Sequence, residues 1–343
     1  MNAIRPQRMI GLAASARASS LALTLVLSLA SAGLCSAQDL IAELAWAYAI
    51  TPGPAPTPPV DDGTLHSLAG SDRSFTLDQI RNRLGPADWF PGDHPSMPPI
   101  VAVGREQGAI WACGLCHYPN GKGRPENAGV VGLPKEYFIQ QLHDFKNGLR
   151  HSAEPLKANT ELMAGFALAM TDAEIEESAA YFSSMPWTAW IEVVETQSVP
   201  KTRVQGGMHL RLEGAEAGME PIGRRIIETP KNAEHTELLR NPRSGFIAYV
   251  PVGAVARGEA LVRTQSGKTT PCTICHGEDL NGLAFVPSLR GRSPSYTARQ
   301  LADFKQGTRH GAWAPLMSPV VANLTADDML NLSAYLASLP PNP

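Results

Sequence analysis

The chain has 343 residues, a formal net charge of −3 at pH 7 and a sequence pI near 6.3. This length allows two domains of ordinary size, and the lack of a basic excess argues against a nucleic-acid partner. The 30 glycines and 29 prolines indicate many turns and long connections, so we expect a globular protein with much irregular structure.

The first 100 residues comprise a secretory signal peptide at 1–37 and a Pro-rich extension at 38–100. Basic residues precede the apolar run LALTLVLSLA (21–30), and small residues end at Ala37, which predicts export to the periplasm with cleavage there. Because the uncharged stretch is also close to the minimum length of a membrane helix, an uncleaved N-terminal segment that associates with a membrane is the alternative. The segment TPGPAPTPPVDDG (51–63) predicts an extended linker.

Residues 101–186 and 253–343, the first and second repeat, are two copies of one unit. Two long blocks align in the same order: 137–152 with 296–311, identical at 9 of 16 positions, and 162–186 with 316–340. A cysteine motif precedes each pair of blocks at an offset of 159 residues. Self-similarity through three separated blocks indicates a duplicated domain, and two copies are too few for a solenoid.

Each repeat is predicted to be helical. An apolar stripe at spacings of 4, 3 and 4 predicts a helix that presents Phe138, Leu142, Phe145 and Leu149 on one face. The last helix of the first repeat begins with a capping box at Thr171 and Glu174, and Thr325 with Asp328 is its weaker counterpart. A unit of about 90 residues with so many loops buries little core by itself, so another group must fill its centre.

Between the repeats, residues 187–252 contain the runs WIEVVE (190–195) and GFIAYVPV (245–252), which predict a few strands. The predicted fold class is therefore mainly α, with two tandem units joined by a partly β and irregular insert.

Each repeat carries one C-x-x-C-H motif. A redox thiol pair needs a thioredoxin-like βαβ setting, which the flanking loops do not provide, and structural zinc needs two such pairs close together in the sequence. In covalent attachment of haem c the two thiols add to the vinyl groups, and the adjacent histidine reaches the iron from the same side. We therefore predict two covalently bound haem c groups with their iron, held by Cys113, Cys116, His117, Cys272, Cys275 and His276.

The sixth ligand of each iron is predicted to be methionine. Met163 and Met317 occupy equivalent positions before the final helices, and their retention in two divergent copies favours ligation by sulfur over a packing role. Met170 aligns with Leu324 and is expected in the core. His151 and His310 also match and offer a bis-histidine alternative, although a place near the haem propionates or the surface is favoured.

Each repeat resembles a class I cytochrome c domain, and the pair resembles di-haem proteins of the cytochrome c4 type. The matching residues are CGLCH, CTICH, the QLxDFKxGxRH helix, the following methionine and the terminal helix. The resemblance implies His/Met ligation, a periplasmic location and electron transfer. In the family a proline carbonyl steadies the axial histidine. Pro287 matches it, whereas the first repeat has Ala128, so the hydrogen bond to His117 stays open.

These features predict an electron carrier without enzymatic activity, which exchanges electrons with a redox protein donor, such as a dehydrogenase or reductase, and a terminal acceptor. A six-coordinate iron with two protein ligands has no open position for substrate. The alternatives are a di-haem redox enzyme of the peroxidase or thiosulfate-oxidising type, or the cytochrome subunit of a dehydrogenase complex.

Overall fold

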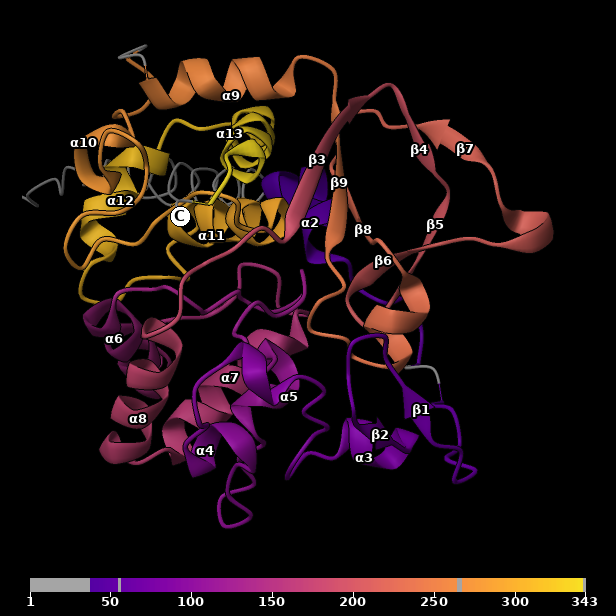
Figure 1. Cartoon of the computed structure of the whole chain (residues 1–343). Coiled ribbons are helices and arrows are strands. Elements are labelled where there is room, and N and C mark those ends of the chain that lie inside the picture. Colours follow the sequence, from indigo (N-terminus) through magenta and orange to yellow (C-terminus); the bar gives the residue numbers. More distant parts are fainter. Residues whose placement is uncertain (1–37, 55–56, 264–266, 342–343) are drawn as a thin grey trace, which may run out of the picture.

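The computed structural model describes residues 38–54, 57–263 and 267–341, and the predicted signal peptide lies outside them. The described chain is mainly helical with a small β portion. In Figure 1 the helices of the second repeat lie at the top, those of the first repeat lie at the lower left, and the strands of the insert extend to the right. No helix in the described part has the length and apolar character needed to cross a membrane.

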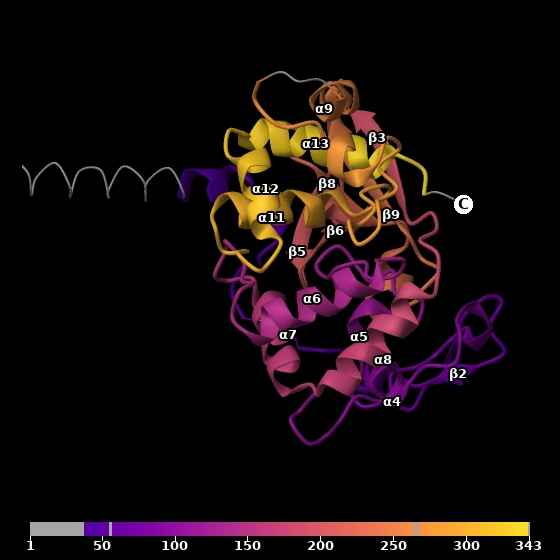
Figure 2. The same cartoon turned by 90° about the vertical axis from the view of Figure 1, so that its left-hand side faces the viewer.

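The two repeats contain the same succession of helices. In and just before the first repeat these are α4 (Pro99–Ala102), α5 (Cys113–His117), α6 (Lys135–Lys146), α7 (Ala158–Ala169) and α8 (Asp172–Ser183). In the second repeat they are α9 (Ala254–Arg263), α10 (Thr273–His276), α11 (Pro294–Lys305), α12 (Ala314–Val321) and α13 (Ala326–Ser338). Figure 2, turned by 90°, shows the second set above the first.

The helix predicted from the apolar stripe is α6, and it ends earlier than the stripe. Phe138 and Leu142 are buried, but Leu149 lies beyond the helix because the chain turns at Gly148 with φ +68°. A residue with a Cβ rarely adopts this conformation, so glycine favours the stop. Both predicted capping boxes are formed, and the one at Thr325 is as complete as the one at Thr171.

The insert holds the two predicted strand runs side by side. β3 (Ile191–Thr196) and β9 (Phe246–Pro251) pair in parallel over six residues, and β8 (Ile227–Pro230) is antiparallel to β9. The remaining strands of the insert form two separate antiparallel pairs: β4 (Ser198–Pro200) with β7 (Met219–Pro221), and β5 (Thr202–Gln205) with β6 (Met208–Arg211). The short turns η2 (Gly214–Glu216) and η3 (Glu234–Leu238) lie between strands.

The extension is more than a linker. Its described proline-rich residues form no helix or strand, as predicted, but the sequence on both sides is folded. Residues 38–43 are helical, and the remaining elements are α2 (Ala45–Tyr48), β1 (His66–Ser67), β2 (Ser74–Phe75), α3 (Leu77–Arg81) and η1 (Pro91–Asp93). Leu44, Trp46 and Tyr48 are buried in the core of the second repeat, whereas Trp89 belongs to a separate, smaller hydrophobic cluster.

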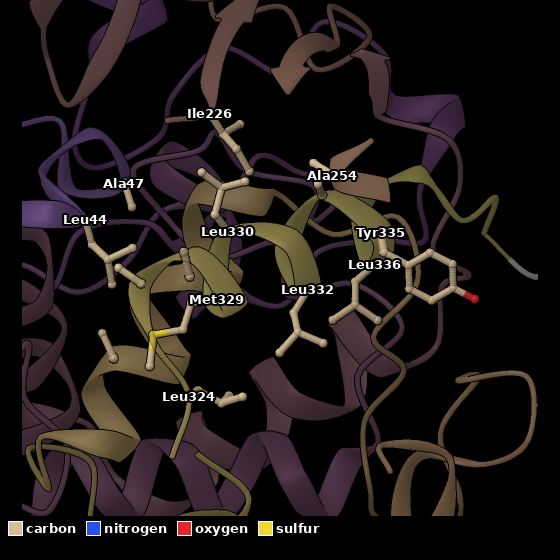
Figure 3. Packing of buried hydrophobic residues seen from close by; sticks show 14 of the residues in the cluster. Leu44, Ala47, Ile226, Ala254, Leu324, Met329, Leu330, Leu332, Tyr335 and Leu336 are labelled. Carbon is tan, nitrogen blue, oxygen red and sulfur yellow. The ribbon is translucent and has the colours of Figure 1, made fainter. Parts of the chain in front are cut away.

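The largest hydrophobic core is built around α13. Figure 3 shows Met329, Leu330, Leu332, Tyr335 and Leu336 of this helix in the cluster, joined by Leu44 and Ala47 from the extension and Ile226 from the insert. Eleven of its thirteen residues are buried, which is the pattern of a helix enclosed on all sides. Segments far apart in the sequence thus share one core.

The crossing of α9 over α13 depends on Gly258. A Cβ at this position would lie 2.0 Å from the main-chain oxygen of Asn331 and 2.7 Å from Cβ of Tyr335. Since real Cβ atoms do not approach backbone so closely, any larger side chain must push the two helices apart.

We expect Gly258→Ala to lower the free energy of unfolding by about 1–3 kcal/mol, because overpacking forces α9 away from α13. The matched control is Gly165→Ala on exposed α7, where no atom lies within 4 Å of the added Cβ. That control should stabilise the protein by about 0.5–1 kcal/mol through lower chain entropy. Urea unfolding of both variants measures the difference, and equal effects of the two changes would contradict the crossing argument.

Candidate functional site

The two C-x-x-C-H motifs form short helices whose histidines are held alike. Nδ1 of His117 lies 2.8 Å from the carbonyl oxygen of Ala128, and Nδ1 of His276 lies 2.8 Å from that of Pro287. The acceptor is a main-chain oxygen eleven residues after the histidine in both cases, so its side chain does not decide the bond. The hydrogen bond that the sequence left open at the first repeat is therefore the same as at the second.

This arrangement prepares both histidines as metal ligands. A proton on Nδ1, donated to the carbonyl, leaves the lone pair on Nε2 at the other side of the ring. Burial lowers the pKa of His117 and of His276, because charging an imidazole without water is unfavourable. Both rings are thus kept neutral, as ligation requires.

Each histidine lines a cavity that contains one methionine of its own repeat. His117 and Met163, which lies on α7, share a cavity of about 120 Å³, while His276 and Met317, on α12, share one of about 290 Å³. Met170 is buried in the core of the first repeat, as the sequence predicted. The structure therefore brings together the histidine and the methionine that the sequence paired in each repeat.

The cysteines lie beside these cavities as free thiols. Cys272 and Cys275 line the second cavity, and Cys113 packs against the same core cluster as Met163. Burial raises the pKa of the Cys113 thiol to about 12 and that of Cys272 to about 11. These two buried thiols therefore form little of the thiolate that disulfide exchange requires.

The two repeats contact each other through Arg150 and Arg309, each of which donates hydrogen bonds to a glutamine of both repeats. Arg150 donates to Gln141 of its own repeat at 2.9 Å and to Gln300 of the other at 2.8 Å. Arg309 donates to Gln300 at 3.0 Å and to Gln141 at 2.6 Å. The remaining reciprocal bonds run from Arg150 to Tyr296, from Arg309 to Tyr137, from His151 N to Thr308 O and from His310 N to Leu149 O.

The two cavities share this contact as a common wall. Tyr137, Gln141, Tyr296 and Gln300 line both cavities, so each repeat completes the site of the other. A network in which every arginine has partners from both repeats fixes their relative orientation. Two groups bound in these cavities would lie on opposite faces of one layer of side chains.

The other histidines differ in burial and in whether they line a cavity, which the sequence did not predict. His310 is exposed and does not line the second cavity, whereas the matching His151 lines the first. The sequence predicts that the histidines without a counterpart in the other repeat (His66, His94, His143, His209 and His235) are ordinary surface or loop residues. This is wrong for His209, which is buried on β6 with Nε2 3.0 Å from the carbonyl oxygen of Trp46. His94 does lie in a loop, where its Nε2 is 3.2 Å from Oδ1 of Asp88.

Two cations in the first cavity were missed by the sequence analysis. Lys157 donates to the carbonyl oxygen of Tyr48 at 3.1 Å, and burial lowers its pKa to about 7. Arg299 of the second repeat donates to the carbonyl oxygens of Ala47 and Pro125. The signal for Lys157 was its place in the segment 153–161, where the second repeat has only residues 312–315, but the contacts themselves depend on the folded extension.

Comparison with known proteins identifies the family of the chain. The family model described as Cytochrome c matches residues 255–340. Cytochrome c-554(548) of Halomonas halodenitrificans is 34% identical over 87 residues, which cover 25% of this chain and 96% of that protein. The chain belongs to the cytochrome c family.

Other members of the family match a longer part of this cytochrome. Cytochrome c4 of Stutzerimonas stutzeri is 26% identical over 242 residues, covering 68% of this chain and 87% of its own. A protein named thiosulfate dehydrogenase electron acceptor, from Thiomonas intermedia, is 26% identical over 268 residues, covering 76% and 89%. The similarity to both extends over more than one repeat.

The residues of both cavities fit the cofactor that the family implies. In each repeat a neutral imidazole with a free Nε2 and a thioether sulfur line the same cavity, and two free cysteines stand beside the histidine in the chain. This donor set suits a covalently attached haem with histidine and methionine as axial ligands.

We expect the redox potential of the first site to fall as the pH rises through about 6. Asp303 is buried on the wall of the first cavity, and burial raises its pKa to about 6. Above that pH its negative charge stabilises the ferric over the ferrous iron, which lowers the potential on the order of tens of millivolts.

Asp303→Asn should remove this pH dependence and leave the potential near its low-pH value, as measured by spectroelectrochemical titration. The exposed Asp172→Asn is the control and should titrate like the unchanged protein. A pH profile that survives in Asp303→Asn would show that another group is responsible.

Proposed function

We propose that this cytochrome is a periplasmic di-haem electron carrier that passes electrons from a dehydrogenase or reductase to a terminal acceptor. The observation that carries the proposal is the matched pair of sites, each with one buried histidine and one methionine on the same cavity. We further propose that the two repeats are tandem class I cytochrome c domains, because their helices follow in the same order around these sites.

The bound haem supplies a reversible one-electron couple between ferric and ferrous iron. The residues of the chain determine how that couple is used. His117 and His276 are oriented by carbonyl bonds, so their rings need not reorganise when the charge of the site changes. Met163 and Met317 would supply the second protein ligand of each haem, and a thioether ligand would favour the ferrous state and a high potential.

The shared wall supports transfer between the two sites within one molecule. Gln141, Gln300 and their tyrosine neighbours line both cavities. An electron that enters at either site would therefore cross one layer of packed side chains to reach the other.

Enzymatic alternatives receive less support. A peroxidase needs an iron position that can open, whereas each cavity here offers a methionine. A thiosulfate-oxidising enzyme with a cysteine ligand needs a further thiol, and all four cysteines from residue 38 onward belong to the two motifs. The similarity to a protein named thiosulfate dehydrogenase electron acceptor supports a thiosulfate dehydrogenase as one donor to test.

The proposal predicts two haems and two methionine ligands per chain. A pyridine haemochrome assay should give two covalent haems, and the oxidised protein should show the far-red band of methionine sulfur bound to ferric iron. Met163→Ala and Met317→Ala should each remove about half of that band and open one iron to carbon monoxide in the reduced state. Met170→Leu, a buried methionine outside the cavity lining, is the control and should leave the band unchanged.

Carbon monoxide binding to the unchanged reduced protein would contradict the proposal, because it requires an open iron. That result would instead favour a di-haem redox enzyme.

We also predict export with cleavage after Ala37. Expression of the full chain in a bacterium with a cytochrome c maturation system should place the haem-containing protein in the periplasmic fraction, with Gln38 as the first residue by mass spectrometry. Retention in the membrane fraction with an intact N-terminus would instead identify the segment as an uncleaved anchor.

A further inference from the structure

The two cysteine motifs differ sharply in exposure although their sequences match. Leu115, between the cysteines of the first motif, is 7% exposed, and its counterpart Ile274 is 59% exposed. Cys116 is partly buried, whereas Cys275 is exposed. The cysteine edge of the second site therefore faces solvent, whereas the cysteine edge of the first site is covered.

The edge of the first site is covered by segments that lie outside the repeats. Arg240, which follows η3 in the insert, donates to the carbonyl oxygen of Leu115 and lies over the ring of Tyr118. Asn120 donates to the carbonyl oxygen of Pro242 at 2.7 Å. From the extension, the guanidinium of Arg83 stacks over Trp111, just before the motif, and the carbonyl oxygen of Arg83 accepts from Ala112.

A second part of the insert covers the loop that follows the first motif. The turn between β5 and β6 approaches so closely that a Cβ at Gly207 would lie 2.7 Å from Cβ of Glu126. Glu126 itself is buried and paired with Arg124 at 2.5 Å. At the matching positions of the second repeat, Leu283 and Phe285 are exposed.

Exposed apolar side chains surround the mouth of the second cavity. We call Ile274, Leu283, Phe285 and Leu316 the apolar rim. Phe285 and Leu316 line the cavity together with Cys275, so the rim stands where the thiols of the motif reach the surface. Phe285 packs on Trp313 with ring centroids 4.8 Å apart, which keeps this side of the rim in place.

The rim is also free of charge. The segments 269–277, 280–289 and 311–326, which form it, contain no Asp, Glu, Lys or Arg, and the charged residues that directly flank the first two are Lys268, Glu278, Asp279 and Arg290. In Figure 1, α10 and α12 lie on the side of the molecule opposite to the hairpin β1–β2 and the strands β4 and β7. Apolar patches on a soluble protein mark contact surfaces, and an uncharged contact favours a partner face that is itself apolar and uncharged.

We propose that the extension and the insert close the first site to partners, and that electrons enter and leave through the second site alone, where the apolar rim docks redox proteins with an uncharged apolar contact face. An electron lost by a donor would be gained by the haem held at the second site, and an electron lost there would be gained by an acceptor, with no proton or co-reactant required. A haem held in the first cavity would exchange electrons with partners only by way of the second site, across the shared wall of Gln141 and Gln300. This inference rests on the proposed electron-carrier function.

Access to the two sites can be measured directly in the oxidised, haem-loaded protein. Proton NMR resolves haem methyl signals that are shifted by the ferric iron, and Met317→His assigns one set to the second site by moving it. A neutral gadolinium chelate should broaden the methyl signals of the second site several times more than those of the first. Equal broadening of both sets, or stronger broadening of the first set, would overturn the proposal.

Docking at the rim can be tested with a second copy of this chain as the redox protein. Electron self-exchange between oxidised and reduced copies should proceed by contact of two rims. The double variant Ile274→Glu with Leu316→Glu should slow exchange about tenfold or more at low salt, because like charges face each other, and high salt should restore much of the rate. Since both side chains are mostly exposed, the variant should fold.

The matched control is Leu162→Glu, which changes the first-repeat counterpart of Leu316 at a 42% exposed position. It should leave the self-exchange rate within about twofold of the unchanged protein, since surface changes away from a contact have small effects. An equal loss of rate in this control, or a wild-type rate with a strong salt dependence, would refute docking at the rim.

A low haem count or a missing sulfur band would instead refute the proposed function, and the gadolinium experiment would still report which cavity is open.

Discussion

The reciprocal contact between Arg150 and Arg309 is the constraint on which the geometry of this cytochrome depends. Each arginine reaches the glutamine of the other repeat, and the buried guanidinium groups are satisfied only when both repeats are in place. Buried cations without partners are costly, so the network strongly favours one relative orientation. That orientation places the two cavities on opposite faces of one wall, which is the arrangement that the proposed transfer between them requires.

The extension and the insert, which lie outside the repeats, give the two similar sites different surroundings. The extension and the insert contribute Leu44, Ile226 and their neighbours to the core of the second repeat, and they cover the cysteine edge of the first. The same segments also place Lys157 and Arg299 in contact with the main chain of the extension beside the first cavity. The two sites therefore hold their histidines by the same bond but differ in the charged residues around them and in the exposure of their cysteine edges.

Local features of both sites follow from the repeat alone. The bond from His117 to the carbonyl oxygen of Ala128 and that from His276 to Pro287 are equivalent because the loops have the same length and the acceptor is main chain. The exposure of Leu115 and Ile274 differs because exposure depends on what packs from elsewhere. Both repeats therefore hold their histidines in the same way, whereas the segments that pack around the two motifs differ.

The sequence by itself determined the family, the repeat, the cysteine and histidine positions, the capping boxes and the strands β3 and β9, because each of these depends on residues close together in the chain or on matched spacing. It also paired Met163 and Met317 with their histidines through the repeat. Only the tertiary structure decided the parallel pairing of β3 with β9, the buried state of His209 and the end of α6 at Lys146. It alone decided the cover over Leu115, because Arg240 lies 125 residues away and no local pattern encodes such a contact.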